Sequence, residues 1–256
     1  MIVSGENRLY GDLAPWYHLL SHPSEHAAEA DYYGAVIREL APGAATLLEL
    51  GSGGGNNASY LKQAYTCTLS DVSDAMIAIS REINPECDHI HADMRTLRLG
   101  QAFDVVFVHD AIEYMLTEVD LRAAIETVAA HLAPGGIALI TPDAVSETFE
   151  PGTDCGGNDG DDGRSLRYLE WTTDRDPGDC VFEVEFAMLL REPDAGLRVE
   201  YDHHTFGVFP RATWRRLFHD AGLVEVPHGI PDPYEGQHVV FALRKSIERL
   251  QTADLT

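Results

Sequence analysis

The chain is poor in basic side chains. Its 256 residues include 18 lysines and arginines, only two of them lysines, against 42 aspartates and glutamates, and the formal net charge is −24 at pH 7. Nucleic-acid binding draws its affinity from Lys and Arg on phosphates, and a strongly negative field opposes that approach. We therefore expect no nucleic-acid partner.

Long apolar runs are also missing. Apolar runs such as residues 105–108 and 137–140 have only the length of strands, whereas a membrane-spanning helix needs about 20 apolar residues. The N-terminus lacks the basic and apolar pattern of a signal peptide. We expect no membrane segment and a cytoplasmic location. Hydrophobic residues still make up 45% of the chain, which suffices for a large α/β domain.

Metal-binding and disulfide patterns are absent as well. No C-x-x-C pair or His/Cys zinc spacing occurs, and free thiols are expected at Cys67, Cys87, Cys155 and Cys180. Three histidines have helical spacing but are interrupted by a proline: His18, His22 and His26. The acidic, glycine-rich segment 150–163 does not match the ligand spacing of a calcium loop. We expect no metal site.

What the sequence does contain is a glycine-rich turn, E-L-G-S-G-G-G-N, at residues 49–56. An apolar run precedes it, a plausible helix at 56–65 follows it, and Asp71 ends the next apolar run. This layout predicts a strand, a turn, a helix and a second strand that carries a ribose-binding carboxylate. The glycines read G-x-G-x-G, whereas a dinucleotide fold requires glycine where Asn56 stands. A nicotinamide oxidoreductase is therefore the disfavoured alternative.

The pattern resembles the class I S-adenosylmethionine-dependent methyltransferases. Five of their landmarks follow in order: residues 49–55, Asp71-Val72-Ser73, Ala92-Asp93-Met94, residues 103–109 and residues 132–136. The resemblance covers residues 30–142 closely. It implies S-adenosylmethionine as the cofactor, held by Tyr17, Glu49, Gly51, Gly53, Gly55, Asp71, Val72, Met76, Asp93, Met94 and His109.

The residue types explain part of this assignment. An ionised Asp71 can accept hydrogen bonds from both ribose hydroxyls, provided that Ser73 caps the next helix. The resemblance puts Asp93 on the adenine amino group, although an ordinary loop aspartate is the alternative. Met76 could pack on the adenine or simply in the core. Aromatic side chains attract a sulfonium cation, so the N-terminal segment could close over it with Tyr10, Trp16 and Tyr17, or merely pack on the body.

The order of elements predicts the fold class α/β, as a Rossmann-like, doubly wound, seven-stranded sheet. Expected strands at 46–50, 66–71, 88–92, 103–109 and 136–141 alternate with helices at 56–65, 73–83 and 119–132. A further helix at 27–40 precedes them. A helix at 211–221 and two strands, near 223–226 and 237–244, complete the core.

Residues 143–206 interrupt this order. After the acidic loop come three runs that favour strands: 165–173, 180–191 and 197–206. We interpret them as an antiparallel β cap inserted after the fifth strand for acceptor binding. The domains are then 1–142, 143–206 and 207–256. The insertion, the aromatic N-terminus and residues 204–209 resemble the methyltransferases of dTDP-linked amino sugars.

The predicted function is methyl transfer to a small-molecule acceptor, with an amine nitrogen preferred over an oxygen. Between Glu150 and Glu185, eleven acidic and three basic residues fit a cationic acceptor or a solvated rim equally well. Candidate bases are His204, His203 and His109, the last of which ends the fourth strand. His203 and His204 are adjacent on an expected strand and point to opposite faces. Only one of them can therefore enter the pocket, and His204 is preferred. An O-methyltransferase and a non-catalytic cofactor-binding protein are the alternatives. A homodimer is possible.

Overall fold

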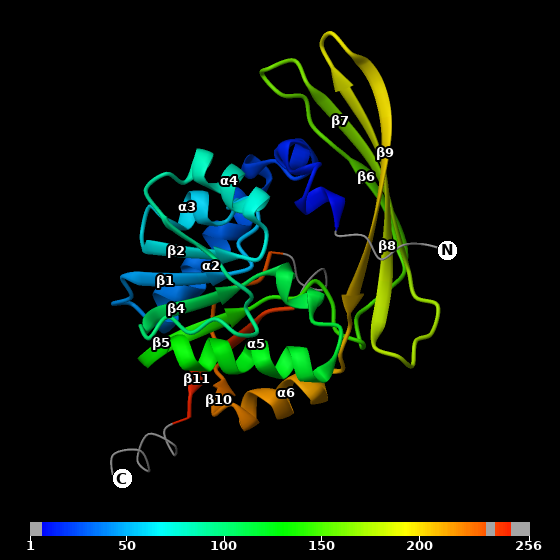
Figure 1. The fold of residues 1–256 in the computed structure, drawn as a ribbon. Helices are drawn as coiled ribbons and strands as arrows, with labels where there is room; N and C mark the ends of the chain where they lie inside the picture. The colour runs from blue at the N-terminus through cyan, green and yellow to red at the C-terminus, as the bar shows by residue number, and fades with distance from the viewer. Residues whose placement is uncertain (1–6, 234–238, 247–256) are drawn as a thin grey trace.

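A seven-stranded sheet forms the centre of the protein in a computed structural model that describes residues 7–233 and 239–246 (Figure 1). Its strands are β1 (Thr46–Leu50), β2 (Thr66–Asp71), β3 (Asp88–His91), β4 (Phe103–Val108), β5 (Leu132–Ile140), β10 (Leu223–Glu225) and β11 (Phe241–Lys245). They lie in the order β10-β11-β5-β4-β1-β2-β3. β1 to β5 are parallel, and β11 is antiparallel to β5 and β10. The predicted Rossmann-like sheet is confirmed.

Helices cover both faces of this sheet because successive strand residues point in opposite directions. Leu47 belongs to the apolar cluster under one layer of helices, and Leu48 belongs to the cluster under the other. The helices are α1 (Tyr17–Leu20), α2 (Ala27–Leu40), α3 (Ala58–Leu61), α4 (Asp74–Ile83), α5 (Glu118–His131) and α6 (Arg211–Asp220). Short 3-10 turns are η1 (Arg8–Tyr10), η2 (Ala14–Trp16), η3 (Pro23–His26) and η4 (Asp110–Tyr114).

Local sequence signals account for the helix starts. The Ser73 hydroxyl accepts a hydrogen bond from the N–H of Met76 at 3.1 Å and so caps α4, as predicted. Thr117 caps α5 in the same way. The helix expected at 56–65 is wrong in length, because α3 has only four residues and the chain around it forms turns. The expected strand near 237 begins, within the described residues, only at Phe241.

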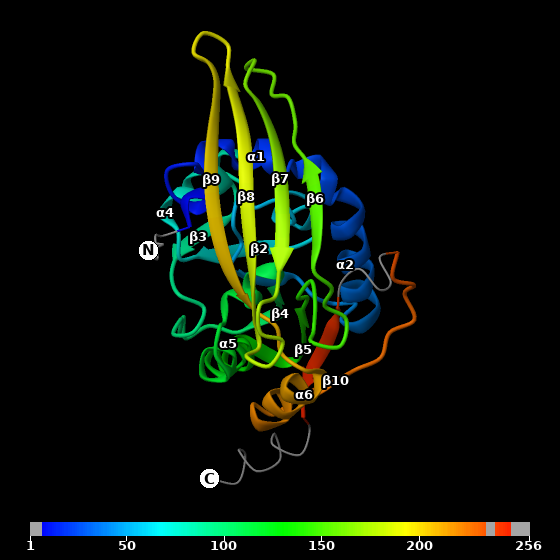
Figure 2. The same cartoon turned by 90° about the vertical axis from the view of Figure 1, so that its right-hand side faces the viewer.

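A second, antiparallel sheet stands beside the carboxyl ends of the parallel strands (Figures 1 and 2). Its four strands lie in sequence order: β6 (Gly152–Gly156), β7 (Ser165–Thr173), β8 (Val181–Glu192) and β9 (Gly196–Gly207). Three of them match the predicted runs. β6 was expected to be loop, and its pairing with β7 corrects that prediction. This sheet is called the cap below. That the cap is a domain separate from the core stays a prediction.

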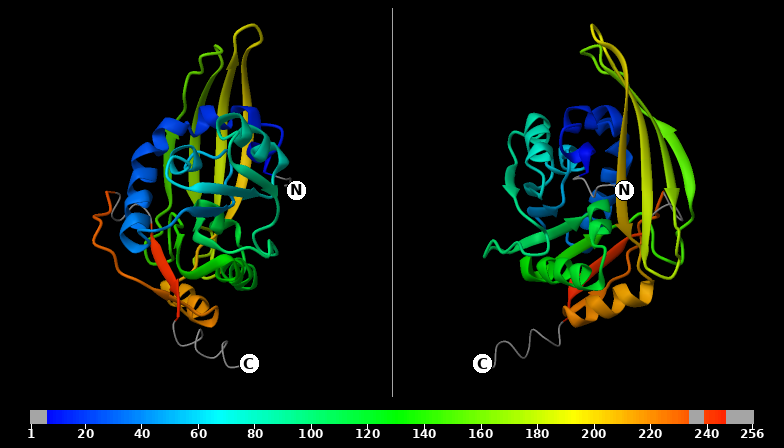
Figure 3. Two further views of the ribbon diagram at one scale, coloured as in Figure 1. Left: turned by 90° about the vertical axis from the view of Figure 1, so that its left-hand side faces the viewer. Right: turned by 45° about the vertical axis from the view of Figure 1, so that its right-hand side comes forward.

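The N-terminal segment lies between the core and the cap (Figure 3). Its apolar residues Leu9, Leu13, Trp16 and Leu19 form a third buried cluster with the inner face of the cap. The Leu9 N–H donates to Asp202 on β9 at 2.7 Å. The segment is thus a structural part of the cap, although it precedes the sheet in the chain.

The outer face of the cap is partly apolar. Its exposed side chains include Leu169, Trp171, Leu197, Val199 and Tyr201. All four cysteines are free thiols, as expected. Over residues 7–233 and 239–246, the structure contains no helix that is long and apolar enough to cross a membrane.

Candidate active site

A cavity of about 940 Å³ opens where the carboxyl ends of the parallel strands meet the cap. The glycine turn and the loops after β2, β3, β4 and β5 form its floor, and the N-terminal segment covers one side. The inner face of the cap contributes Glu170, Thr172, Phe182, Val184, Phe186 and Phe206. The cavity therefore reaches from the predicted cofactor residues to the predicted acceptor domain without interruption.

The glycines of the turn have different roles. A Cβ on Gly51 would lie 2.3 Å from the Ala111 Cβ, and one on Gly55 would lie 2.3 Å from Asn84 and Ser80 side-chain atoms. Larger residues are therefore excluded there by packing inside the protein. Gly51 and Gly53 line the cavity, whereas Gly55 does not. The expectation that Gly55 contacts the cofactor gains no support from this position.

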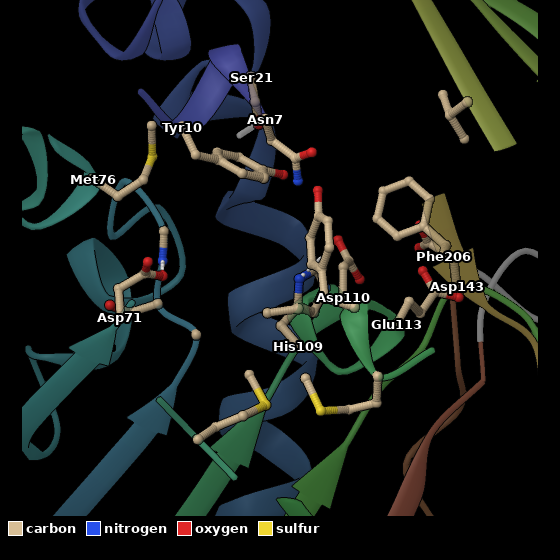
Figure 4. A pocket seen from close by; sticks show the side chains of 18 of the residues that line it. Asn7, Tyr10, Ser21, Asp71, Met76, His109, Asp110, Glu113, Asp143 and Phe206 are labelled. Atoms are coloured by element: carbon tan, nitrogen blue, oxygen red, sulfur yellow. Dashed lines mark hydrogen bonds and ion pairs between the residues drawn. The ribbon is translucent and has the colours of Figure 1, made fainter. Parts of the chain in front are cut away.

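Asp71 ends β2 and lines the cavity (Figure 4). Its Oδ2 accepts from the N–H of Gly53 at 2.8 Å, and its Oδ1 accepts from the N–H of Ser73 at 2.8 Å. Burial raises the pKa of Asp71, and these two backbone N–H groups counteract part of that rise. Each oxygen retains a lone pair, so the carboxylate can still accept two donors at once.

Several buried acceptor atoms of the floor have no hydrogen-bond partner within the described part of the chain. They are Glu49 Oε2, Ser52 Oγ, Asn56 Oδ1 and Asn57 Oδ1, and all four residues line the cavity. Unpaired buried oxygens are costly, so such a set indicates a ligand that brings donors. S-adenosylmethionine carries an ammonium group and two ribose hydroxyls. The residues present therefore fit this cofactor.

Glu49 is the most unusual of these groups. Its side chain is buried at the end of β1, and burial raises its pKa to about 8. Without a donor beside it, the carboxyl group is held protonated in the neutral range. A cationic donor would reverse this preference.

The buried Glu49 makes the stability of the protein depend on pH. The folded protein keeps the Glu49 proton up to about pH 8, whereas the unfolded chain releases it near pH 4.5, so the buried carboxyl costs stability as pH rises between these values. Glu49→Gln has no such proton. Its free energy of unfolding should exceed that of the parent by an amount that grows with pH, to about 3 kcal/mol at pH 7. Urea unfolding of the cofactor-free proteins between about pH 5 and pH 8 measures this difference. Parallel pH curves would contradict it.

The predicted adenine residues lie together. Val72, Met76, Asp93 and Met94 all line the cavity, and Figure 4 shows Met76 close to Asp71. Met76 and Met94 are at most 9% exposed, so each is also a core residue. The guanidinium of Arg95 donates to both oxygens of Asp93, which leaves that carboxylate fewer free lone pairs for an adenine amino group.

His109 is enclosed between two carboxylates. Its Nε2 contacts Glu29 of α2, and its Nδ1 lies 3.0 Å from Asp110 Oδ2. Burial alone lowers the pKa of His109, but Asp110 and Glu29 outweigh it and raise that pKa well above its ordinary value. The ring is therefore a paired imidazolium at neutral pH. The structure gives His109 no free lone pair, which argues against the predicted role as a base.

Carboxylates gather on the side of the cavity away from Asp71. Figure 4 shows Asp110, Glu113 and Asp143 together, near Phe206 of the cap. Glu113 is 3% exposed, and burial together with the charge of Asp143 raises its pKa well above its ordinary value. The basic side chains that line the cavity are His26, Arg95 and His109. This side of the cavity therefore favours a cationic ligand.

The aromatic N-terminal residues divide into two groups. Tyr10 and Tyr17 line the cavity. Trp16 instead lies in the third buried cluster, where the guanidinium of Arg164 stacks on its ring at 5.1 Å. Trp16 is thus a packing residue, and only the two tyrosines can reach a sulfonium.

The two histidines of β9 lie on opposite faces of the cap. The His203 side chain is 24% exposed and lies 3.9 Å from Glu183. His204 is 1% exposed, and its ring nitrogens contact the Tyr114 hydroxyl at 2.6 Å and Asp202 at 2.9 Å. Neither residue lines the cavity. Direct contact with an acceptor, which was predicted for only one of the two histidines with His204 preferred, is therefore not supported.

Sequence reasoning missed several residues that form the acceptor side. Asp143 follows β5 just as His109 follows β4, so the same strand-end argument would have found it. Asp202 stands two residues before His204 on the same face of β9, which the strand period predicts. Nothing in the sequence pointed to Glu29, Glu113 or Tyr114. Within the described ranges, no three His, Cys, Asp or Glu side chains are placed so that they could hold a metal ion.

Known proteins resemble this chain over most of its length. The family described as "Methyltransferase domain" matches residues 47–136. The dTDP-3-amino-3,6-dideoxy-alpha-D-glucopyranose N,N-dimethyltransferase of Streptomyces fradiae is 30% identical over 226 residues, which cover 86% of this chain and 88% of that protein. The chain belongs to the class I S-adenosylmethionine-dependent methyltransferases. The predicted enzyme class, cofactor and transfer to a small-molecule acceptor are thereby confirmed.

Solved structures agree with the fold of this methyltransferase. DesVI from Streptomyces venezuelae superposes with a TM-score of 0.81 at 25% identity and covers 92% of this chain and 99% of its own. CalS10, an amino pentose methyltransferase from Micromonospora echinaspora solved with S-adenosylmethionine, gives a TM-score of 0.73 at 26% identity. That match covers 94% of this chain and 100% of CalS10.

Proposed function

We propose that this methyltransferase methylates the amino group of a dTDP-linked amino sugar. The observation that carries the proposal is the carboxylate side of the cavity, Asp110, Glu113 and Asp143, which faces aromatic residues of the cap. Burial favours the neutral forms of Glu113 and Asp143, and an ammonium group beside them would favour their ionised forms. The cap offers a wall to the sugar ring. Two relatives of similar length, from Streptomyces fradiae and Streptomyces venezuelae, are named as N,N-dimethyltransferases of dTDP-linked amino sugars.

The bound cofactor supplies an electrophilic methyl group on a sulfonium. The residues of this chain provide the alignment that the displacement requires. We assign Asp71 to the ribose and Glu49 with Ser52 to the cofactor's polar end. Tyr10 and Tyr17 cover the cavity and exclude water from it. Holding nucleophile and methyl group in line converts a bimolecular reaction into an effectively unimolecular one.

An acceptor amine also needs a proton acceptor. At neutral pH it is largely protonated, and a protonated nitrogen has no lone pair to attack. The carboxylates of the cavity bind this cation, which raises its pKa further. Binding and deprotonation are therefore separate requirements, and the second calls for a base.

Incubation with S-adenosylmethionine and a panel of dTDP-linked sugars tests this function. The panel contains matched pairs that carry an amino or a hydroxyl group at the same ring carbon. We expect S-adenosylhomocysteine release and a product heavier by one or two methyl groups with the amino sugars only. Turnover of the hydroxyl sugars would favour the O-methyltransferase alternative. Tight cofactor binding without any turnover would favour a non-catalytic binding protein.

Two further expectations remain proposals. Light scattering of the purified protein tests the possible homodimer. Electrophoretic mobility assays with DNA and RNA test the expected lack of nucleic-acid binding, which the net charge of −24 supports.

A further inference from the structure

We propose that Tyr114, His204 and Asp202 form a proton relay, in which the Tyr114 hydroxyl takes a proton from the acceptor amine and passes its own proton to His204. The proposal rests on the function proposed above, since it assumes an amine acceptor. It makes Tyr114 the contact with the acceptor and makes His204 and Asp202 positioning residues behind it.

The three side chains form a continuous chain of hydrogen bonds. The Tyr114 hydroxyl lies 2.6 Å from His204 Nδ1, and His204 Nε2 lies 2.9 Å from Asp202 Oδ2. Tyr114 belongs to η4, directly after β4, and lines the cavity. The relay therefore joins the floor of the cavity to the cap across 90 residues of sequence.

The environment fixes the proton on the His204 ring. Asp202 is 4% exposed. Its burial favours the neutral acid, but hydrogen bonds from His204 and the Leu9 N–H keep its pKa below its ordinary value. An ionised Asp202 accepts only, so His204 must donate from Nε2. In a neutral ring, which the relay assigns to His204, Nδ1 then carries the lone pair and accepts from the Tyr114 hydroxyl.

The ring is also isolated from water. His204 is 1% exposed, and the rings of Tyr10, Phe186 and Phe206 lie within 5.8 Å of it, measured between ring centres. The titratable groups that face it are Asp202 on β9, Tyr114 on η4, Tyr10 on η1 and Glu170 on β7. A proton can therefore reach His204 from the cavity through Tyr114.

The ammonium gives one proton to the Tyr114 oxygen while the original hydroxyl proton moves to His204 Nδ1, and the resulting imidazolium is paired with Asp202. The freed lone pair of the nitrogen forms the bond to the methyl carbon, and the carbon–sulfur bond breaks with its electrons on sulfur. After product release the same path returns the proton to water.

Kinetics of Tyr114→Phe, His204→Gln and the double variant test this relay. Removing a positioned base costs about 10²–10⁴-fold in rate, so each single variant should lose that much in kcat. The double variant should be no slower than the slower single variant, because the residues act as one unit. Cofactor affinity by calorimetry should stay unchanged. His219→Gln on the exposed end of α6, where the ring is 87% exposed, is the matched control.

The pH profile separates a proton path from a structural role. Above the pKa of the acceptor amine, the free base is already present, so the variants should recover towards the parent rate. A purely structural defect would lower kcat equally at every pH. Losses that multiply in the double variant, or profiles parallel to that of the parent, would overturn the relay.

An arm without any acceptor keeps this test independent of the proposed function. Nitrogen-15 spectra of histidine-labelled protein should show His204 as the neutral tautomer with its proton on Nε2, and Tyr114→Phe should shift the Nδ1 signal. A proton on Nδ1 would refute the relay even if no amino sugar is turned over. If no amine is turned over but the spectrum is as predicted, the proposed function is refuted and only the hydrogen-bond chain remains.

Discussion

Asp71→Ala is expected to weaken S-adenosylmethionine binding by about a hundredfold or more. A hydrogen bond to a charged group contributes roughly 1.5–3 kcal/mol, and the variant loses two of them to the ribose. Asp71 also accepts from the N–H groups of Gly53 and Ser73, so its removal loosens the turn that faces the cofactor. Both effects act in the same direction. Titration calorimetry measures the dissociation constant.

The control is Asp74→Ala. Asp74 is a carboxylate three residues away at the start of α4, and its side chain is 82% exposed. Its removal changes the net charge equally but touches neither the turn nor the cavity. An unchanged dissociation constant in Asp71→Ala would show that the ribose lies elsewhere.

Removing the cap should abolish methyl transfer altogether. A short linker in place of residues 145–204 deletes one wall of the cavity and the aromatic side chains Phe182 and Phe186 with it. The cofactor residues precede residue 142, so a folded truncation should still bind S-adenosylmethionine. Release of S-adenosylhomocysteine and calorimetry report the two properties separately. A well-folded truncation that methylates its acceptor at the parent rate would refute the role of the cap.

Paired point variants answer the same question without deleting a domain. Phe186 is on the inner face of β8 and lines the cavity, whereas Leu189 is 43% exposed on the outer face. Phe186→Ala should lower kcat/KM for the acceptor by at least about tenfold, because a buried aromatic contact is lost. Leu189→Ala should leave it unchanged. Equal effects of the two variants would contradict an acceptor site on the inner face.

Local patterns sufficed for the cofactor half of the fold. Three features depend on contacts between close neighbours in sequence, so their residue types reveal them: the turn at 49–56, the helix N-cap at Ser73 and the carboxylate at Asp71. β6 shows the limit of this reasoning. Its residues Gly152–Gly156 include two glycines and an aspartate, which disfavour strands, and only pairing with β7 makes them one.

The acceptor half depends on distant contacts, which one sequence does not reveal. The role of His109 could not be foreseen because its partner Glu29 comes from a helix far earlier in the chain. His204 was predicted to point into the pocket as a base. It lies on the inner face of the cap but does not line the cavity, and its contact on the cavity side is Tyr114. Burial and pairing, rather than residue type, decide whether a histidine is a free base.

The position of the N-terminal segment against the cap has a consequence for the order of folding. Leu9 and Asp202, which hold the two together, are 193 residues apart in sequence. The parallel sheet is completed mainly by neighbouring units, whereas closing a loop of this length carries a larger entropic cost. During synthesis, residues 7–22 must wait for the strands of the cap before they can bury their apolar side chains. We expect hydrogen exchange during refolding to protect the central strands first, and the amides of Leu9 and His204 together in a later phase.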